Sequence, residues 1–238
     1  MARTAFAALL LSCAAARALA GDLVMLAPTD QTMPIVRFQD GRLAGGILKD
    51  VGDAIAQRLG RRAVYLNAGV LEVKPMLTAG RADAICYVIP LWIDGDYEWS
   101  TPLIPDAEMV VARAGAPAVH SLRDLRDRPV ATVAGYRYQR VEQVLGKHFL
   151  RTDAETLDKS LQQVIDGQVQ YTIIAENQLA YLQRNNPSLK VRPDLVFSAF
   201  KAQCAMSRKS QVPFAEFNRA IDSMLSDGSV DQILARYR

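Results

Sequence analysis

Short apolar runs alternate with amphipathic segments along the first part of the chain. Residues 23–27, 63–66 and 83–89 are predicted strands, because each apolar run is short and bounded by charged or turn-forming residues. Between them, residues 46–60 space their apolar side chains as one face of a helix and end in a glycine. A second helix is expected near residues 70–79. This β-α-β-α-β order predicts a parallel sheet covered by helices.

The same alternation then begins again, and it predicts a second α/β unit. The further elements expected are strands at 108–112, 129–133, 171–175 and 202–207, and helices at 121–125, after 138, and at 156–165, 178–185, 211–226 and 229–237. No low-complexity linker separates the two units, so two lobes joined by crossing strands are expected rather than two independent domains. We place lobe one at residues 21–110 and 200–238, and lobe two at 111–199.

The first twenty residues have the pattern of a secretory signal peptide. A positive start at Arg3 precedes an apolar stretch and the small-residue pattern Ala18-Leu19-Ala20. An alternative is a lipoprotein leader that ends before Cys13, which would become the lipidated first residue, although Leu11 and the short leader are atypical of that motif. No later apolar run approaches the ~20 residues that span a bilayer. Export to the periplasm is therefore expected, with residues 1–20 removed.

Charge and motifs exclude several classes of function. Without Arg3 and Arg17 the formal charge falls from +3 to +1, and no basic runs remain that would favour nucleic acid. Nucleophile elbows, phosphate-binding loops, zinc-protease motifs and C-x-x-C pairs are absent. The two histidines, His120 and His148, are 28 positions apart without ligand-like neighbours. We expect no catalytic residues, metal or cofactor, and a monomer.

Six segments in this order resemble the periplasmic solute-binding proteins of family 3, the polar amino-acid binders of ABC importers. They are GRLAGGILKDVGDAIAQRLG (41–60), AGRADAI (79–85), WSTPL (99–103), SLRDLRDRPVATVAGY (121–136), DGQVQYTIIAEN (166–177) and SDGSVDQILARY (226–237). The resemblance implies two Rossmann-like lobes with parallel-rich sheets, joined by a two-strand hinge, the type II periplasmic binding fold. It also implies a solute held between the lobes by loops beyond the carboxyl ends of the strands.

The loop after residue 88 departs from the family pattern. Typical amino-acid binders carry an arginine there that clamps the ligand carboxylate, whereas IPLWIDGDYEW (89–99) contains no arginine or lysine. Trp92 and Tyr97 are expected to wall the cleft, with packing against lobe one as the alternative, and the acids of the loop could favour a cation. Trp99 is expected to pack beside the hinge.

Lobe two departs as well. Gly135-Tyr136-Arg137 replaces the usual Gly-Thr, and Arg137 stands where a helix begins, a place that favours an anion. By resemblance Glu176 aligns with the aspartate that receives the ligand amino group. We expect Tyr136, Arg137 and Glu176 to contact the ligand, together with Asp30 after the first strand. The alternatives are an exposed Arg137 and a capping role for Glu176.

Cys86 and Cys204 are the two cysteines left after the leader, and in an exported protein such a pair suggests a disulfide. The resemblance brings the strand at 202–207 back beside the third strand of lobe one, antiparallel to it, which would place the two cysteines together. Two free thiols that face opposite sides of the sheet are the alternative.

The function expected is capture of a small polar or zwitterionic solute, other than an ordinary α-amino acid, for delivery to an ABC permease in the inner membrane. One alternative is a periplasmic sensor or redox-system accessory protein of the same fold. The other is an enzyme of the dehydratase type, in which Glu176 beside Arg137 would transfer a proton.

Overall fold

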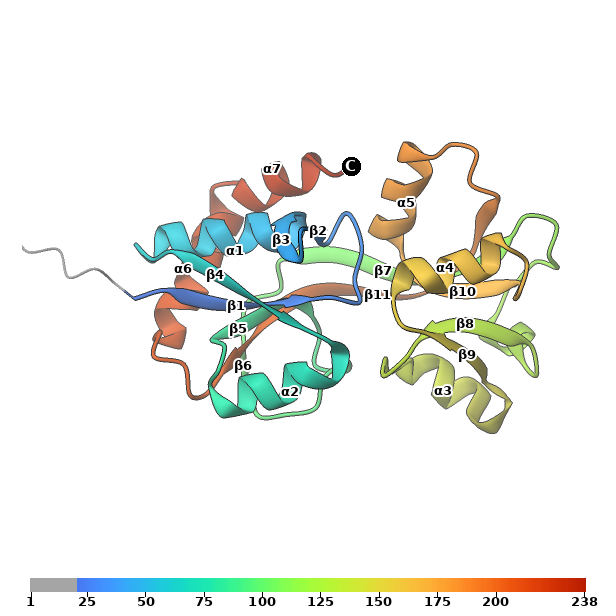
Figure 1. Ribbon diagram of the computed structural model, residues 1–238, viewed down its shortest axis with the longest axis horizontal. Helices are drawn as coiled ribbons and strands as arrows, with labels where there is room; N and C mark the ends of the chain where they lie inside the picture. The colour runs from blue at the N-terminus through green and yellow to red at the C-terminus, as the bar shows by residue number, and fades with distance from the viewer. Residues whose placement is uncertain (1–20) are drawn as a thin grey trace, which may run out of the picture.

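A long antiparallel pair of strands, β7 (Ile104–Arg113) and β11 (Val191–Ser207), runs through both halves of the molecule (Figure 1). The computed structural model describes residues 21–238, so the expected signal peptide and Cys13 lie outside the described residues. The strand order is β4-β1-β5-β11-β7-β10-β8-β9, with β6 paired to β11. The two crossing strands therefore join one group of strands on each side, and we call these groups lobe one and lobe two.

Lobe one is a sheet covered by helices on both faces (Figure 1). It contains β1 (Leu23–Pro28), β4 (Ala63–Ala68), β5 (Ala84–Val88), β6 (Tyr97–Trp99), α1 (Ile47–Arg58), α2 (Val70–Ala79), α6 (Phe214–Ser226), α7 (Ser229–Ala235) and the hairpin β2 (Arg37–Gln39) and β3 (Arg42–Gly45). Met25 packs with α1, α6 and α7, whereas its neighbour Leu26 packs with α2. Alternate residues of a strand point to opposite faces, so both faces of β1 are buried.

Lobe two has the same layered arrangement. It contains β8 (Pro129–Val133), β9 (Leu150–Ala154), β10 (Tyr171–Ala175), α3 (Gln139–Leu145), α4 (Leu157–Ile165), α5 (Glu176–Asn185) and two short 3-10 turns, η1 (Leu122–Leu125) and η2 (Gly146–His148). Leu161 of α4 packs on one face with Val133, and Val141 of α3 packs on the other face with Val130. The Thr156 hydroxyl accepts a hydrogen bond from Lys159 N and caps α4.

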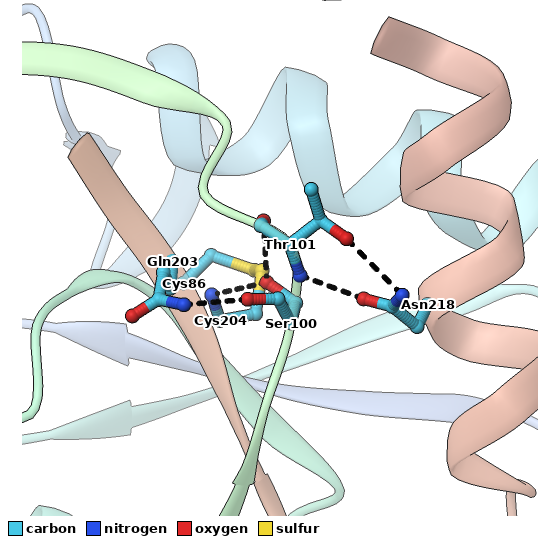
Figure 2. Close-up of a disulfide and its surroundings, with 6 residues drawn as sticks. All are labelled: Cys86, Ser100, Thr101, Gln203, Cys204 and Asn218. Atoms are coloured by element: carbon cyan, nitrogen blue, oxygen red, sulfur yellow. Dashed lines mark hydrogen bonds between the residues drawn. A yellow bond between two sulfur atoms is a disulfide. The ribbon is translucent and has the colours of Figure 1, made fainter.

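The returning strand β11 brings the two cysteines together as a disulfide. Cys204 pairs with Cys86 in an antiparallel register, and their Cα atoms are 3.9 Å apart. Figure 2 shows the bond beside Ser100, whose hydroxyl accepts from Cys204 N at 2.9 Å. Thr101 N in turn donates to Asn218 of α6 at 2.7 Å, so the neighbourhood of the disulfide is tied to a C-terminal helix. The expected disulfide is present.

A bulge follows the disulfide at Tyr87. The register moves from Cys204–Cys86 to Gln203–Val88, which leaves Tyr87 without a partner on β11. Tyr87 has a φ of 62°, and its side chain packs in the same core as Cys86 rather than on the opposite face. A bulge redirects a side chain in this way, and here it turns the Tyr87 hydroxyl toward β7.

The predicted elements agree with the structure where hydrophobic periodicity is strong. β8 and β10 have the predicted bounds, and α2 covers the predicted segment at 70–79. The predicted strand at 202–207 is too short, because β11 begins at Val191 and includes Pro193. The hairpin of β2 and β3 and the strands β6 and β9 were not predicted. The fold class is confirmed, and the lobe boundaries remain a prediction because β7 and β11 cross them.

Candidate functional site

A cavity of ≈ 120 Å³ lies between the two lobes, at the ends of several strands. Lobe one contributes the end of β1, the start of α2, strand β5 and the loop 89–96, and lobe two contributes the loop 134–138, β10 and α5. The lining residues are mostly apolar or aromatic; the polar and charged ones are Asp30, Gln31, Tyr87, Trp92, Glu108, Tyr136, Arg137, Tyr138 and Gln178. An apolar cavity with a few convergent polar groups is the usual form of a small-molecule site.

Asp30 is the most distinctive polar group of the cavity. Its side chain is buried, with the residue 5% exposed, and its Oδ2 accepts a hydrogen bond from the Tyr136 hydroxyl. Its Oδ1 is buried and has no hydrogen-bond partner. Loss of contact with water raises the pKa of the Asp30 carboxyl, although the hydrogen bonds from Tyr136 and from the backbone of Asp30 itself oppose that shift. A buried acceptor without a donor is rare and costly, so it needs an explanation.

A chain of hydrogen bonds crosses the cleft and ends at this carboxylate. Gln178 Nε2 of α5 donates to Gln31 Oε1 at 2.9 Å, Gln31 Nε2 donates to the Tyr136 hydroxyl, and Tyr136 donates to Asp30. Leu157 N of α4 also donates to the backbone carbonyl of Asp30 at 3.0 Å. The chain passes between the lobes more than once, so it holds the cleft closed and points donors at Asp30.

Aromatic side chains form one wall of the cleft. Trp92 stands edge-on to Phe200, with ring centroids 4.9 Å apart, and lies 6.4 Å from the ring of Tyr87. The rings of Tyr136 and Tyr138 follow on the lobe-two side, 6.2 Å apart. Aromatic faces carry partial negative charge and attract a cation that lies within about 6 Å of the ring centroid.

The mouth of the cleft carries an ion pair between the lobes. Arg137 Nη1 lies 2.5 Å from Asp94 Oδ1, and the two side chains are 41% and 69% exposed. Next to it, Gly135 has a φ of 80°, and a Cβ there would lie 3.1 Å from Val70 Cγ1 of lobe one. The loop of lobe two thus approaches α2 closely, and the only arginine of the lining is already paired with a carboxylate of the opposite lobe.

A second buried carboxylate, Asp106 of β7, lies behind the wall of the cavity. Its Oδ2 accepts from the Tyr87 hydroxyl, and its Oδ1 accepts from Ala107 N at 2.8 Å and from Asn177 N at 3.1 Å. Burial raises the pKa of Asp106, and these hydrogen bonds oppose the shift. Asn177 belongs to the first turn of α5, so this network joins β5, β7 and a lobe-two helix.

The structure brings four of the six predicted ligand contacts together. Asp30, Trp92, Tyr136 and Arg137 line the cavity. The other two do not line it: Tyr97 is buried against Trp99 and donates to Asp94 O at 3.2 Å, and Glu176 is exposed at the start of α5. The packing that the sequence offered as the alternative therefore describes Tyr97 in this structure.

Five polar or aromatic residues of the lining were missed by sequence reasoning. They are Gln31, Tyr87, Glu108, Tyr138 and Gln178. Glu108 carried a usable signal, as an acid within the predicted strand at 108–112. Gln178 carried none, because only the structure shows that it is 1% exposed. Within residues 21–238 no group of His, Cys, Asp and Glu could hold a metal ion. No helix of the same range is long and apolar enough to cross a membrane.

Comparison with known families gives a match to the bacterial extracellular solute-binding proteins, family 3, over residues 26–238. No curated protein matches the chain in sequence. The fold is similar to that of an ancestral arginine-binding protein bound to arginine, with 20% identity over 92% of this chain and 99% of that one and a TM-score of 0.79.

Two further solved structures are similar in fold. The first is ArtJ, the arginine-, lysine-, histidine-binding protein from the thermophilic bacterium Geobacillus stearothermophilus, with 18% identity over 91% of this chain and 94% of that one and a TM-score of 0.76. The second is a histidine kinase sensor domain with similarity to periplasmic binding proteins, with 21% identity over 91% and 95% and a TM-score of 0.74.

Proposed function

The chain belongs to the bacterial extracellular solute-binding proteins of family 3, and on that premise we propose that it captures a small solute between its lobes in the periplasm and delivers it to an ABC permease. The observation that carries the proposal is the buried Asp30, which lines the cavity and whose Oδ1 has no donor from another residue. A solute with a hydrogen-bond donor would complete that site. The binding residues proposed are Asp30, Trp92 and Tyr136, with Arg137 at the mouth.

The proposed solute is polar or zwitterionic, but it is not an ordinary α-amino acid. Recognition of an α-carboxylate by this family relies on a clamping arginine in lobe one, and the loop 89–99 has no arginine or lysine. Arg137 in lobe two is engaged by Asp94. No catalytic role is proposed, because the site pairs its acids with hydrogen-bond donors and aromatic rings rather than with a base or a nucleophile.

The experiment that tests capture is mass spectrometry of the small molecules that remain with the protein when it is purified from the periplasm under native conditions. A solute released by denaturation, which then rebinds in calorimetry with one molecule per chain, supports the proposal. A protein that releases nothing and shows no thermal shift with any solute of a broad polar library contradicts it.

A sensor is the second candidate, because the same fold occurs as a histidine kinase sensor domain. Both candidates share the capture step and differ in the partner that responds to it. Genes for a permease and an ATPase beside this one would favour import. A neighbouring kinase or oxidoreductase gene would favour sensing or the accessory role.

A further inference from the structure

The charges that line the cleft are unbalanced toward the negative. Asp30 and Glu108 contribute two carboxylates, and Arg137 is the only basic side chain of the lining in the described residues. Arg137 forms its ion pair with Asp94 at the mouth, so its charge is already compensated. The loop 89–99 adds Asp96 and Glu98, which contact Arg208 away from the cavity. The charge of Arg140 acts on Glu108, but Arg140 does not line the cavity, so the lining itself offers a negatively charged ligand group no unpaired positive side chain.

The unpaired oxygen of Asp30 indicates which kind of hydrogen-bonding group the ligand presents to this carboxylate. An acceptor that is buried within a closed cleft and lacks a donor is satisfied best by a group that only donates. An ammonium group has three donors and a full positive charge, and its hydrogen bond to a carboxylate is stronger than a neutral one. The Tyr136 hydroxyl already donates to Oδ2, and Oδ1 is the oxygen of this carboxylate without a donor from another residue.

The remaining lining suits the body of such a ligand. Trp92, Tyr87 and Tyr136 present rings around the same space, and Val73 and Ile174 complete an apolar surface. Aromatic rings stabilise a neighbouring organic cation, and they do so more strongly as water is excluded. Glu108 lies on the β7 side of the cavity, where it adds a second negative charge.

We propose that the ligand of this cleft is an organic amine with an apolar or aromatic body and no carboxylate, bound through its ammonium group to the Asp30 carboxylate. This inference rests on the proposed capture function and narrows its solute class. Removal of the carboxylate from an amino acid is the chemical step that would supply such a ligand. In this cleft the acidic partner of the ammonium group is therefore Asp30 rather than Glu176, and the lining has no partner for a carboxylate.

The test compares matched pairs that differ only in a carboxylate: phenethylamine with phenylalanine, cadaverine with lysine, and agmatine with arginine. Protein unfolded in guanidinium without reductant, which keeps the disulfide, is refolded free of ligand and titrated calorimetrically. We expect the amine of at least one pair to bind about tenfold or more tightly than its amino acid, since an unpaired carboxylate costs at least ~1.4 kcal/mol on burial.

Each outcome of that titration decides between the two proposals. An amino acid that binds as tightly as its amine, or tighter, overturns the amine inference and leaves solute capture intact. A different solute that co-purifies and binds while all three amines fail also overturns it. A protein that binds no small molecule at all overturns the capture function together with the inference.

Two matched variants locate the ammonium contact. Asp30→Asn is expected to weaken the amine about thirtyfold, because it removes the charge from a buried hydrogen bond. Glu176→Gln makes the same chemical change at the exposed carboxylate on α5 and is expected to leave affinity unchanged. The melting temperature of each ligand-free variant checks that the fold is retained. Equal effects of the two variants, or a larger effect of Glu176→Gln, would overturn the assignment to Asp30.

Discussion

Two buried aspartates, Asp30 in the cleft and Asp106 on the crossing strand β7, have similar surroundings and differ at one oxygen. The residues are 5% and 8% exposed, and burial raises the pKa of each carboxyl. Each accepts a hydrogen bond from a tyrosine hydroxyl, Tyr136 for Asp30 and Tyr87 for Asp106. The second oxygen of Asp106 accepts from two backbone N–H groups, whereas the second oxygen of Asp30 accepts from no other residue.

This difference separates a structural carboxylate from a binding one. A buried polar network with every member satisfied rigidifies a fold, and a network that lacks one donor carries a cost until something supplies it. The Asp106 network is complete and joins the bulged residue Tyr87 to Asn177 at the start of α5. The Asp30 network is incomplete at Oδ1, in a side chain that lines the cavity. We therefore expect damage at Asp106 to appear in stability, and damage at Asp30 to appear in binding.

The largest effect on stability is expected from the disulfide. It lies next to the Asp106 network, because Cys86 directly precedes Tyr87. The bond links positions separated by 118 residues, and chain entropy for so long a loop corresponds to about 4–5 kcal/mol of stability, an upper figure. The double substitution Cys86→Ala and Cys204→Ala should therefore lower the free energy of unfolding in urea by several kcal/mol.

Wild-type protein reduced with a thiol is the control for that experiment, since it breaks the bond while keeping both side chains. Cys86 lines the cavity, but neither form changes a charged group of the lining, so both should keep the ratio of amine to amino-acid affinity. A loss of stability below about 1 kcal/mol in the reduced protein would show that the bond contributes little.

The next effect compares the same substitution at the two aspartates. Asp106→Ala leaves the Tyr87 hydroxyl and two backbone N–H groups without their acceptor, which should cost about 3 kcal/mol of stability or more. Asp30→Ala leaves only the Tyr136 hydroxyl, which still accepts from Gln31, so less than about 1 kcal/mol is expected. Urea unfolding of the two ligand-free variants measures the difference. Equal losses would remove the distinction between the two sites.

The sequence predicts the strands and helices around the two aspartates better than it predicts the hydrogen-bond networks that distinguish them. Strong periodicity located β8, β10 and the helices, because burial on one face or two leaves a local pattern. The first part of β11 was missed because Pro193 and polar residues interrupt its pattern, and its pairing with β7 lies far away in sequence. The bulge at Tyr87 has no local signal, since tyrosine is unusual at positive φ.

The site was predicted in part for the same reason. Loops after strand ends are local features, and they identified Asp30, Trp92, Tyr136 and Arg137. Which of the acids faces the cavity depends on the rotation of a helix and the closure of two lobes. Glu176 aligns with the expected acid, yet the first turn of α5 leaves it exposed and turns Asn177 toward Asp106. Packing between distant parts of the chain therefore determines which acid faces the cavity, and a local sequence pattern does not record it.

A smaller effect is expected from pH, and it distinguishes the two carboxylates by titration. The pKa of Asp30 is raised in the free protein, and a bound ammonium would favour the ionised form and lower it. Binding should therefore release protons in the window between the ordinary and the raised pKa. Affinity should fall by up to about tenfold per pH unit, or 1.4 kcal/mol, as the pH decreases through that window.

Calorimetry in two buffers of different ionisation enthalpy measures the protons released. The tyrosines beside Asp30 do not contribute, since burial raises the pKa of both Tyr136 and Tyr87 well above their ordinary value. Glu108 also lines the cavity and has a raised pKa, so Glu108→Gln is the control that should keep the release. Proton release that survives Asp30→Asn and disappears in Glu108→Gln would move the ammonium contact to Glu108.

The smallest effect concerns the ion pair at the mouth, which tests why the cleft lacks a partner for a carboxylate. Arg137 and Asp94 are both exposed enough for solvent to screen them, so their pairing contributes less than about 1 kcal/mol. Asp94→Asn frees the guanidinium at the edge of the cavity. The amino acid of each matched pair should then gain up to about fivefold in affinity, and its amine should change little.

Asp96→Asn is the control, because it removes an acid of the same loop that contacts Arg208 instead. It should change the affinity of neither ligand. An equal gain from both variants would mean that overall loop charge, rather than release of Arg137, limits carboxylate binding, and no gain from Asp94→Asn would mean that Arg137 cannot reach the ligand even when free.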